Sequence, residues 1–336
     1  MFSNIVLAFK DMKIQMSLIT FSEWDWDVFK FAELCDGKPL VYAMNHVFES
    51  YNVFQRFNID RMIALNFFRA IESSYLDVPY HNCIHGVDVM QATHWLLSTK
   101  SAAGMINDTD LFSALIAAVA HDVAHPGTNN AFEISRRSDL ATIYNDRSVL
   151  ENFHVSTIFR LLKKQENDIM ANFSSSMYRE VRETIIEMIL ATDMAFHTRQ
   201  VAHIKSVAES KRSSKLGFTK DDRLLALTSA IHCADLSTAA RPLHVSKKWV
   251  FSVYEEFFKQ GDREKELGLP ISPLCDRRKP NIEKGQIGFI SFVTLPLYHA
   301  WAECSTEVKS CILRIEENLK YWKEQAAAAS PRSPPA

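Results

Sequence analysis

The stretch that most constrains the fold is AAVAHDVAHPGTNN, residues 117–130, in which small apolar residues lead directly into ionisable side chains. A helix from Leu111 to Ala120 would pack closely on its neighbours. It would then end in His121, Asp122 and His125, whose burial costs free energy unless a partner compensates for it. A divalent metal ion is the partner that this combination favours. The alternative is an ordinary helix end, where the helix dipole favours histidines.

Helical geometry makes a more specific prediction about this stretch. On a continuous helix His121 and His125 lie four residues apart on one face, with Asp122 about 100° further round. Pro126 and Gly127 then end the helix and let the chain turn away. The polar cluster should therefore lie at the C-terminal end of the helix.

The rest of the chain favours an all-α fold. Apolar residues recur at helical spacing, and no strand-period run or βαβ alternation is found. A hydrophobic content of 47%, with 9 Gly and 11 Pro in 336 residues, indicates a compact helical protein. We predict a single compact multi-helix bundle over residues 21–325, preceded by an N-terminal lead-in, residues 1–20, and followed by a disordered tail, residues 326–336.

Charge and cysteine content restrict the partners and the compartment. The 38 basic and 40 acidic residues give a formal net charge of −2, so the chain has no excess of positive charge of the kind that binds nucleic acid. No stretch reaches the roughly 18 to 20 apolar residues needed to cross a bilayer. The six cysteines show neither CxxC spacing nor a disulfide-rich frame, which fits reduced thiols. We expect a cytoplasmic protein with no nucleic-acid partner and no membrane segment in this chain.

Two further predicted helices carry ligand-type residues at their ends. The stretch YHNCIHGVDVMQATHWLL, residues 80–97, predicts a helix on which His81 and His85 project together. Another apolar helix opens near Thr219 and ends at Asp235. Three apolar helices thus supply four candidate metal ligands, namely His85, His121, Asp122 and Asp235.

This set of side chains suits hydrolytic metal chemistry. Mixed imidazole and carboxylate ligation suits Zn²⁺, carboxylate with water suits Mg²⁺ or Mn²⁺, and a bridging Asp122 could serve both. Each residue alone could be a core histidine or a capping aspartate. Two metals together lower the pKa of a shared water from about 15.7 toward about 7 and neutralise charge on a phosphoryl oxygen. His81, one turn before His85, is placed to protonate the leaving alkoxide, although alone it could be a surface histidine.

Six sequence blocks resemble the catalytic domain of class I cyclic-nucleotide phosphodiesterases. They occur in that family's order, and the resemblance covers roughly residues 20 to 325. The blocks are Tyr80–His85, His121–Asn130, Ser148–Asn152, Ala191–Met194, His232–Ser237 and Gln286–Phe289.

The resemblance implies a role for each matched residue. His81 would be the general acid, and the four ligands would hold the tighter ion, taken as Zn²⁺. Asp122 would bridge to a second ion, Mg²⁺ or Mn²⁺. The waters bound to this second ion would be oriented by His125, Glu151 and Thr192. Such a role is also reasonable on physical grounds, because hydrogen-bonding groups around a metal site commonly orient what the metal binds. The implied fold is a bundle of about sixteen helices.

The resemblance also implies a nucleotide-binding clamp. Gln286 would hydrogen bond the purine edge, Phe289 and Val253 would enclose the ring, and Tyr80 would also contact substrate. An amide offers both a donor and an acceptor, and an aromatic face stacks on any base. The alternatives are core packing for Phe289 and a solvated position for Gln286.

Two positions depart from the common family pattern. Ala124 stands where many members carry an acidic residue, which affects outer hydrogen bonds and not the ligands. Thr238 stands where members selective for cyclic AMP often carry asparagine. The choice between cyclic AMP and cyclic GMP therefore stays open, with cyclic AMP expected to be at least one substrate.

We therefore expect an enzyme that hydrolyses 3′,5′-cyclic nucleotides to 5′-monophosphates and so ends cyclic-nucleotide signals. One alternative is a broader HD-type phosphohydrolase, against which the purine clamp argues. Another is an inactive nucleotide sensor, against which the complete set of ligands and the acid argues. Regulatory modules are expected to be absent from this chain.

Overall fold

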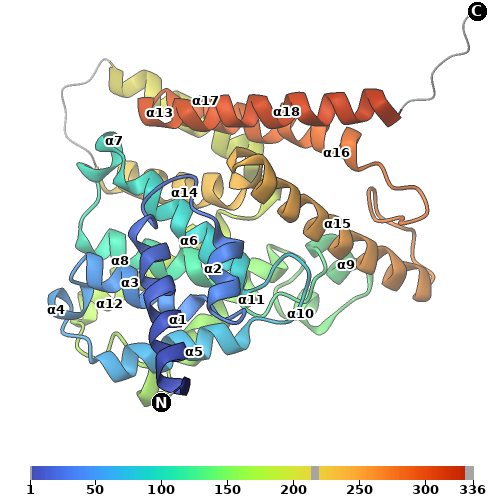
Figure 1. Cartoon of the computed structure of the whole chain (residues 1–336). Helices are drawn as coiled ribbons and strands as arrows, with labels where there is room; N and C mark the ends of the chain where they lie inside the picture. The colour runs from blue at the N-terminus through green and yellow to red at the C-terminus, as the bar shows by residue number, and fades with distance from the viewer. Residues whose placement is uncertain (1, 213–218, 330–336) are drawn as a thin grey trace, which may run out of the picture. The chain divides into compact units, whose positions relative to one another are not determined.

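The structure, a computed structural model, describes residues 2–212 and 219–329. Within these residues every regular element is helical, which confirms the predicted all-α class (Figure 1). The described residues contain eighteen α-helices, of which α4 and α7 have only four residues each. The other sixteen agree with the predicted bundle of about sixteen helices. The described chain divides into two compact units, residues 2–194 with 219–235 and residues 195–212 with 236–329. The domain limits at residues 21 and 325 stay a prediction.

The first unit carries most of the helices. They are α1 (Phe2–Ile19), α2 (Val28–Leu34), α3 (Leu40–Ser50), α4 (Val53–Arg56), α5 (Arg61–Ser74), α6 (Cys83–Ser98), α7 (Lys100–Ala103), α8 (Asp108–Ala120), α9 (Asn130–Ser135), α10 (Asp139–Ile143), α11 (Val149–Leu162), the 3₁₀ turn η1 (Gln165–Asn167), α12 (Ser175–Leu190) and α14 (Lys220–Asp235).

Helix α8 forms the centre of the first unit. It packs against α6, α12 and α14, and every residue from Phe112 to Ala120 is buried. Small side chains along this helix let its neighbours approach closely. Its N-cap is Asn107, which forms a capping box with Asp110. The Asn107 side chain accepts from the Asp110 backbone N–H at 2.8 Å, which satisfies one of the donors in the first turn of the helix.

The second unit contains the remaining helices. Helix α13 packs against α17, and α16 and α17 pack against α18. The elements that follow the 3₁₀ turn η2 (Met194–Phe196) are α13 (His197–Arg212), η3 (Ser237–Ala240), α15 (Leu243–Glu266), α16 (Ile282–Phe289), the π-helical segment η4 (Ile290–Thr294), α17 (Leu295–Ala302), η5 (Thr306–Val308) and α18 (Lys309–Ala329).

Helix α15 continues through Gly261, which faces the Cys275 backbone at a point where a Cβ would overlap. One expectation for the second unit needs correction. The tail predicted from Ala326 begins within α18, since alanine has the highest helix propensity. The rest of that tail, residues 330–336, lies outside the described residues.

No helix in the described part of the chain has the length and apolar character to cross a membrane. All six cysteines lie within the described residues, and none of them is in a disulfide bond.

Candidate functional site

The first ligand-type residue lies in the first turn of α6. Asn82 caps this helix, and its side-chain oxygen accepts from the backbone N–H of Ile84 at 3.0 Å and of His85 at 3.3 Å. The predicted helix start at Tyr80 is thus corrected to Cys83. The cap fixes the first turn, so that His85 projects inward and is almost fully buried.

The HD pair lies where α8 ends. His121 is the C-cap residue, and its Nδ1–H donates to the Ala118 carbonyl at 2.9 Å. This bond fixes the orientation of the imidazole ring, so that its Nε2 lies 3.0 Å from Asp122 Oδ2. Asp235, the last residue of α14, approaches from a third helix.

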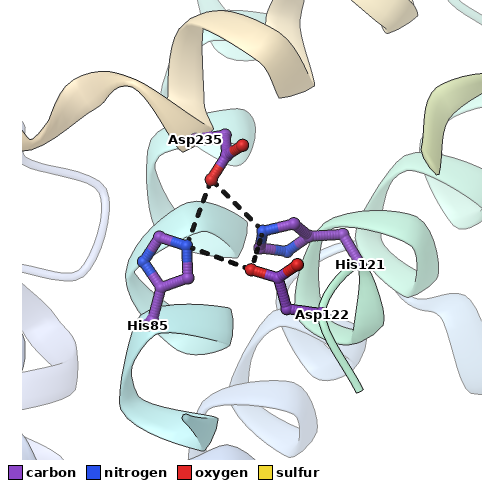
Figure 2. Close-up of side chains that lie close together, drawn as sticks. All are labelled: His85, His121, Asp122 and Asp235. Atoms are coloured by element: carbon purple, nitrogen blue, oxygen red, sulfur yellow. Dashed lines mark hydrogen bonds and ion pairs between the residues drawn. The ribbon is translucent and has the colours of Figure 1, made fainter. Parts of the chain in front are cut away.

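These four side chains converge (Figure 2). Asp122 Oδ2 lies 3.0 Å from His121 Nε2 and 3.5 Å from His85 Nε2, and Asp235 Oδ1 lies 3.3 Å and 3.1 Å from the same two atoms. One ligand atom from each residue falls within 4.8 Å of all the others. The structure therefore brings together the four candidate ligands that the sequence analysis named, and their role as metal ligands stays a prediction.

The cluster fits a divalent cation. In a tetrahedron, ligand atoms about 2.0 to 2.2 Å from zinc lie about 3.3 to 3.6 Å from one another. The four separations here, 3.0, 3.1, 3.3 and 3.5 Å, are close to that spacing. Two imidazoles and two carboxylates are also donors that zinc accepts.

Electrostatics also favours positive charge at this position. Burial lowers the pKa of His121, but Asp122 and Asp235 outweigh it and hold that pKa well above its usual value. Burial raises the pKa of Asp122, yet His121, His81 and His125 hold it well below the usual range. The pKa of Asp235 is likewise lowered, because His121 and His85 outweigh burial. A divalent cation would compete with the proton on these imidazoles.

His81 and His125 form a stacked pair beside the cluster. Their ring centroids are 3.9 Å apart with an interplanar angle of 21°, and the buried Tyr80 ring lies 4.7 Å from His81 and 4.6 Å from His85. The predicted helical relation between His121 and His125 is wrong, because α8 ends at Ala120 and Ala124 adopts φ 65°. This left-handed residue turns His125 toward His81.

Glu151 and Thr192, the other predicted water-orienting residues, have different partners. Both oxygens of Glu151 accept from Asn130 Nδ2, at 3.2 and 2.9 Å, and burial next to Asp193 and Asp122 raises its pKa to about 7. The Thr192 hydroxyl donates to the Ile189 carbonyl at 2.8 Å. The role of Thr192 therefore stays a prediction.

His154 is a site residue that sequence reasoning missed. Its Nδ1–H donates to the Val123 carbonyl at 2.7 Å, and its Nε2 lies 3.6 Å from Asp122 Oδ1. Burial lowers its pKa to about 4, so it is neutral at pH 7. The available signal was its position on α11, three residues after Glu151 and hence on the same helix face.

The predicted purine-binding residues lie in the second unit. Val253 is on α15, and Gln286 and Phe289 are on α16. Gln286 is buried, which removes the solvated alternative, and Phe289 is half-buried, so it is not a fully packed core residue.

Comparison with known proteins agrees with this geometry. Residues 80–315 match the family described as 3′5′-cyclic nucleotide phosphodiesterase, and the chain belongs to this family. It is 38% identical over 318 residues to the 3′,5′-cyclic-AMP phosphodiesterase 4C of Mus musculus, covering 93% of this chain and 46% of that protein. It is 37% identical to the 3′,5′-cyclic-AMP phosphodiesterase, isoform F, of Drosophila melanogaster, covering 92% and 48%. The chain thus spans about half the length of these curated relatives.

A solved structure gives the same answer for the fold. The phosphodiesterase domain of the RhoPDE fusion protein from the choanoflagellate Salpingoeca rosetta superposes with a TM-score of 0.86 at 32% identity. The match covers 92% of this chain and 96% of that one. The predicted family and the predicted phosphodiesterase fold are both confirmed.

Proposed function

We propose that this chain hydrolyses 3′,5′-cyclic nucleotides to nucleoside 5′-monophosphates and so ends cyclic-nucleotide signals. The observation that carries the proposal is the convergence of His85, His121, Asp122 and Asp235 in a chain of this family. The relatives named above are cyclic-AMP phosphodiesterases, which supports cyclic AMP as a substrate. Cyclic GMP is the second nucleotide to be tested.

Zn²⁺ is the ion that we assign to the four-ligand cluster, with Mg²⁺ or Mn²⁺ beside it. Asp122 supports a bridging role, because Oδ2 faces the cluster while Oδ1 faces His154. Such ions, when bound, activate water and neutralise charge on a phosphoryl group. Glu151, His154 and Thr192 would orient the waters around the second ion.

His81 is the proposed proton donor to the leaving O3′ atom. Its ring is held against His125, whose Nδ1 accepts from the Gly127 backbone N–H at 3.0 Å. That bond keeps His125 in one orientation, so the face that supports His81 is fixed. Tyr80, Val253, Gln286 and Phe289 would bind the nucleotide.

The test is steady-state hydrolysis of cyclic AMP, cyclic GMP and noncyclic nucleotides before chelation, after it, and after Zn²⁺ with Mg²⁺ or Mn²⁺ is restored. His81→Ala should lower kcat by about 10²- to 10⁴-fold with little change in nucleotide affinity, because only proton transfer is lost. The exposed His203 on α13 provides the control variant His203→Ala, which should leave kcat unchanged. Equal losses of kcat and affinity in His81→Ala would remove the assignment of the acid. Equal turnover of noncyclic nucleotides would favour the broader phosphohydrolase.

A cytoplasmic location also stays a proposal, which the presence of the six cysteines as thiols and not as disulfides supports.

A further inference from the structure

The phenol of Tyr75 contacts both α6, which carries His85, and the end of α8. Tyr75 is the C-cap residue of α5, and its side chain is buried. A Cβ added at Gly86, the residue after His85, would lie 2.6 Å from the phenol oxygen. The hydroxyl donates to the carbonyl of Val119 on α8 at 2.9 Å. One oxygen atom therefore packs against α6 and hydrogen bonds α8.

This hydrogen bond helps to close the C-terminal end of α8. The last carbonyls of a helix have no partner within the helix and need one from elsewhere. In a continuing helix the Val119 carbonyl would accept from the Val123 N–H, four residues further on. The Val123 N–H donates instead to the Ala120 carbonyl at 3.1 Å. Tyr75 thus supplies the Val119 carbonyl with a donor from another helix, two residues before His121.

The same hydroxyl also lies close to the backbone of Asp122. Burial raises the pKa of the Tyr75 phenol well above its usual value, and the charges of Asp122 and Asp235 raise it further. A hydrogen bond with the Asp122 backbone lowers this pKa, but burial and the charges outweigh it. The phenol has one proton, which it gives to Val119, so its oxygen accepts from the Asp122 N–H. Tyr75 therefore bonds the backbone on both sides of His121.

We infer that Tyr75 is a positioning residue that holds His121 and Asp122 in place relative to His85, and so sets the geometry of the metal cluster. The inference rests on the metal site of the proposed function. Without the hydroxyl the buried Val119 carbonyl would lose its donor, which is costly, so the end of α8 should shift. A shift there moves two ligands relative to the third. Loss of the groups that orient metal ligands commonly weakens metal binding by about 10- to 100-fold.

The test is the Zn²⁺ affinity of the folded, full-length chain, measured by competition with a chelator. Tyr75→Phe keeps the ring and removes the oxygen, and it should weaken Zn²⁺ binding by about 10-fold or more. Tyr144→Phe is the matched control, because it removes a hydroxyl that hydrogen bonds Ser156 at 2.8 Å, and it should leave the affinity unchanged. Urea unfolding with chelator present measures the stability of each variant separately. A purely structural role of Tyr75 would lower stability and leave the Zn²⁺ affinity of the folded protein unchanged.

A second variant tests the same contact from α6 and keeps the tyrosine. The Cβ added by Gly86→Ala would press on the hydroxyl, so Zn²⁺ affinity should fall. In the double variant this part of the overlap disappears with the hydroxyl, so the loss of affinity should be smaller than the product of the two single losses.

An unchanged Zn²⁺ affinity in either folded single variant would overturn the role of Tyr75, and so would losses that multiply fully in the double variant. If the unaltered protein binds no Zn²⁺, the proposed metal site fails and this inference fails with it.

Discussion

Gly86 on α6, next to His85, packs closely against the end of α8, which leads into His121. A Cβ added at this glycine would lie 2.7 Å from the Val119 carbonyl oxygen on α8 and 2.6 Å from the Tyr75 hydroxyl. That hydroxyl donates to the same carbonyl at 2.9 Å in a buried hydrogen bond. Gly86→Ala must therefore push α6 away from α8 or break this bond.

The expected cost follows from these two contacts. Overpacking of a close core contact costs about 1–3 kcal/mol. A buried hydroxyl and carbonyl left unpaired add about 1–3 kcal/mol. The higher helix propensity of alanine offsets about 1 kcal/mol of this loss of stability. We expect Gly86→Ala to lower the free energy of unfolding by about 1–5 kcal/mol.

Urea unfolding in the presence of a chelator measures this quantity without a contribution from bound metal. Gly288→Ala on α16 is the matched control, because nothing lies within 4 Å of a Cβ built there, and it should be neutral or stabilising. The folded Gly86→Ala protein should also bind Zn²⁺ more weakly, since His85 moves away from His121. A free energy of unfolding within 0.5 kcal/mol of the unaltered protein would refute the reasoning.

Two further predictions concern charge. Burial, with His46 nearby, lowers the pKa of His94 to about 4, where its ring hydrogen bonds Ser22 at 3.0 Å and Tyr51 at 2.8 Å. As the pH falls, the unfolded state binds the proton before the folded state does. The free energy of unfolding therefore keeps its full value above pH 6.5 and falls by up to about 3 kcal/mol toward pH 4. Urea unfolding at several pH values should show this loss of stability in the unaltered protein and not in His94→Gln. If the free energy of unfolding changed with pH in the same way in both proteins, the prediction would be contradicted. Asp235→Asn removes a negative charge from the cluster, so Zn²⁺ affinity in a chelator competition should fall at least tenfold, and unchanged affinity would exclude Asp235 as a ligand.

The convergence of the four candidate ligands could be predicted from the sequence, because they mark the ends of apolar helices. His85, His121 and Asp235 end or begin helices whose periodicity is visible without coordinates. Periodicity could not give the turn after α8, since the φ of 65° at Ala124 belongs to a residue without a turn signature. His125 was therefore placed on the wrong face.

Some contacts between different helices could not be predicted from the sequence, for a related reason. Tyr254 packs against Gly285 because α15 and α16 approach each other there, and nothing in the local sequence of either helix indicates that approach. His154 was missed because its Nδ1 partner is the backbone of Val123, 31 residues earlier. Spacing rules find side chains that share an element, and they do not by themselves indicate which elements pack together.

The directions of the three helices give a physical reason why a cation should bind at this point. Helices α8 and α14 both present their C-terminal ends to the cluster, and the partial negative charge of those ends favours a cation there. Helix α6 presents its N-terminal end, whose exposed N–H groups would oppose a cation. Asn82 reduces that opposition, because its side chain accepts from two of those N–H groups. Two favourable helix ends, one capped end and two carboxylates together give the cluster a negative electrostatic potential, so a bound cation would offset the cost of burying these side chains.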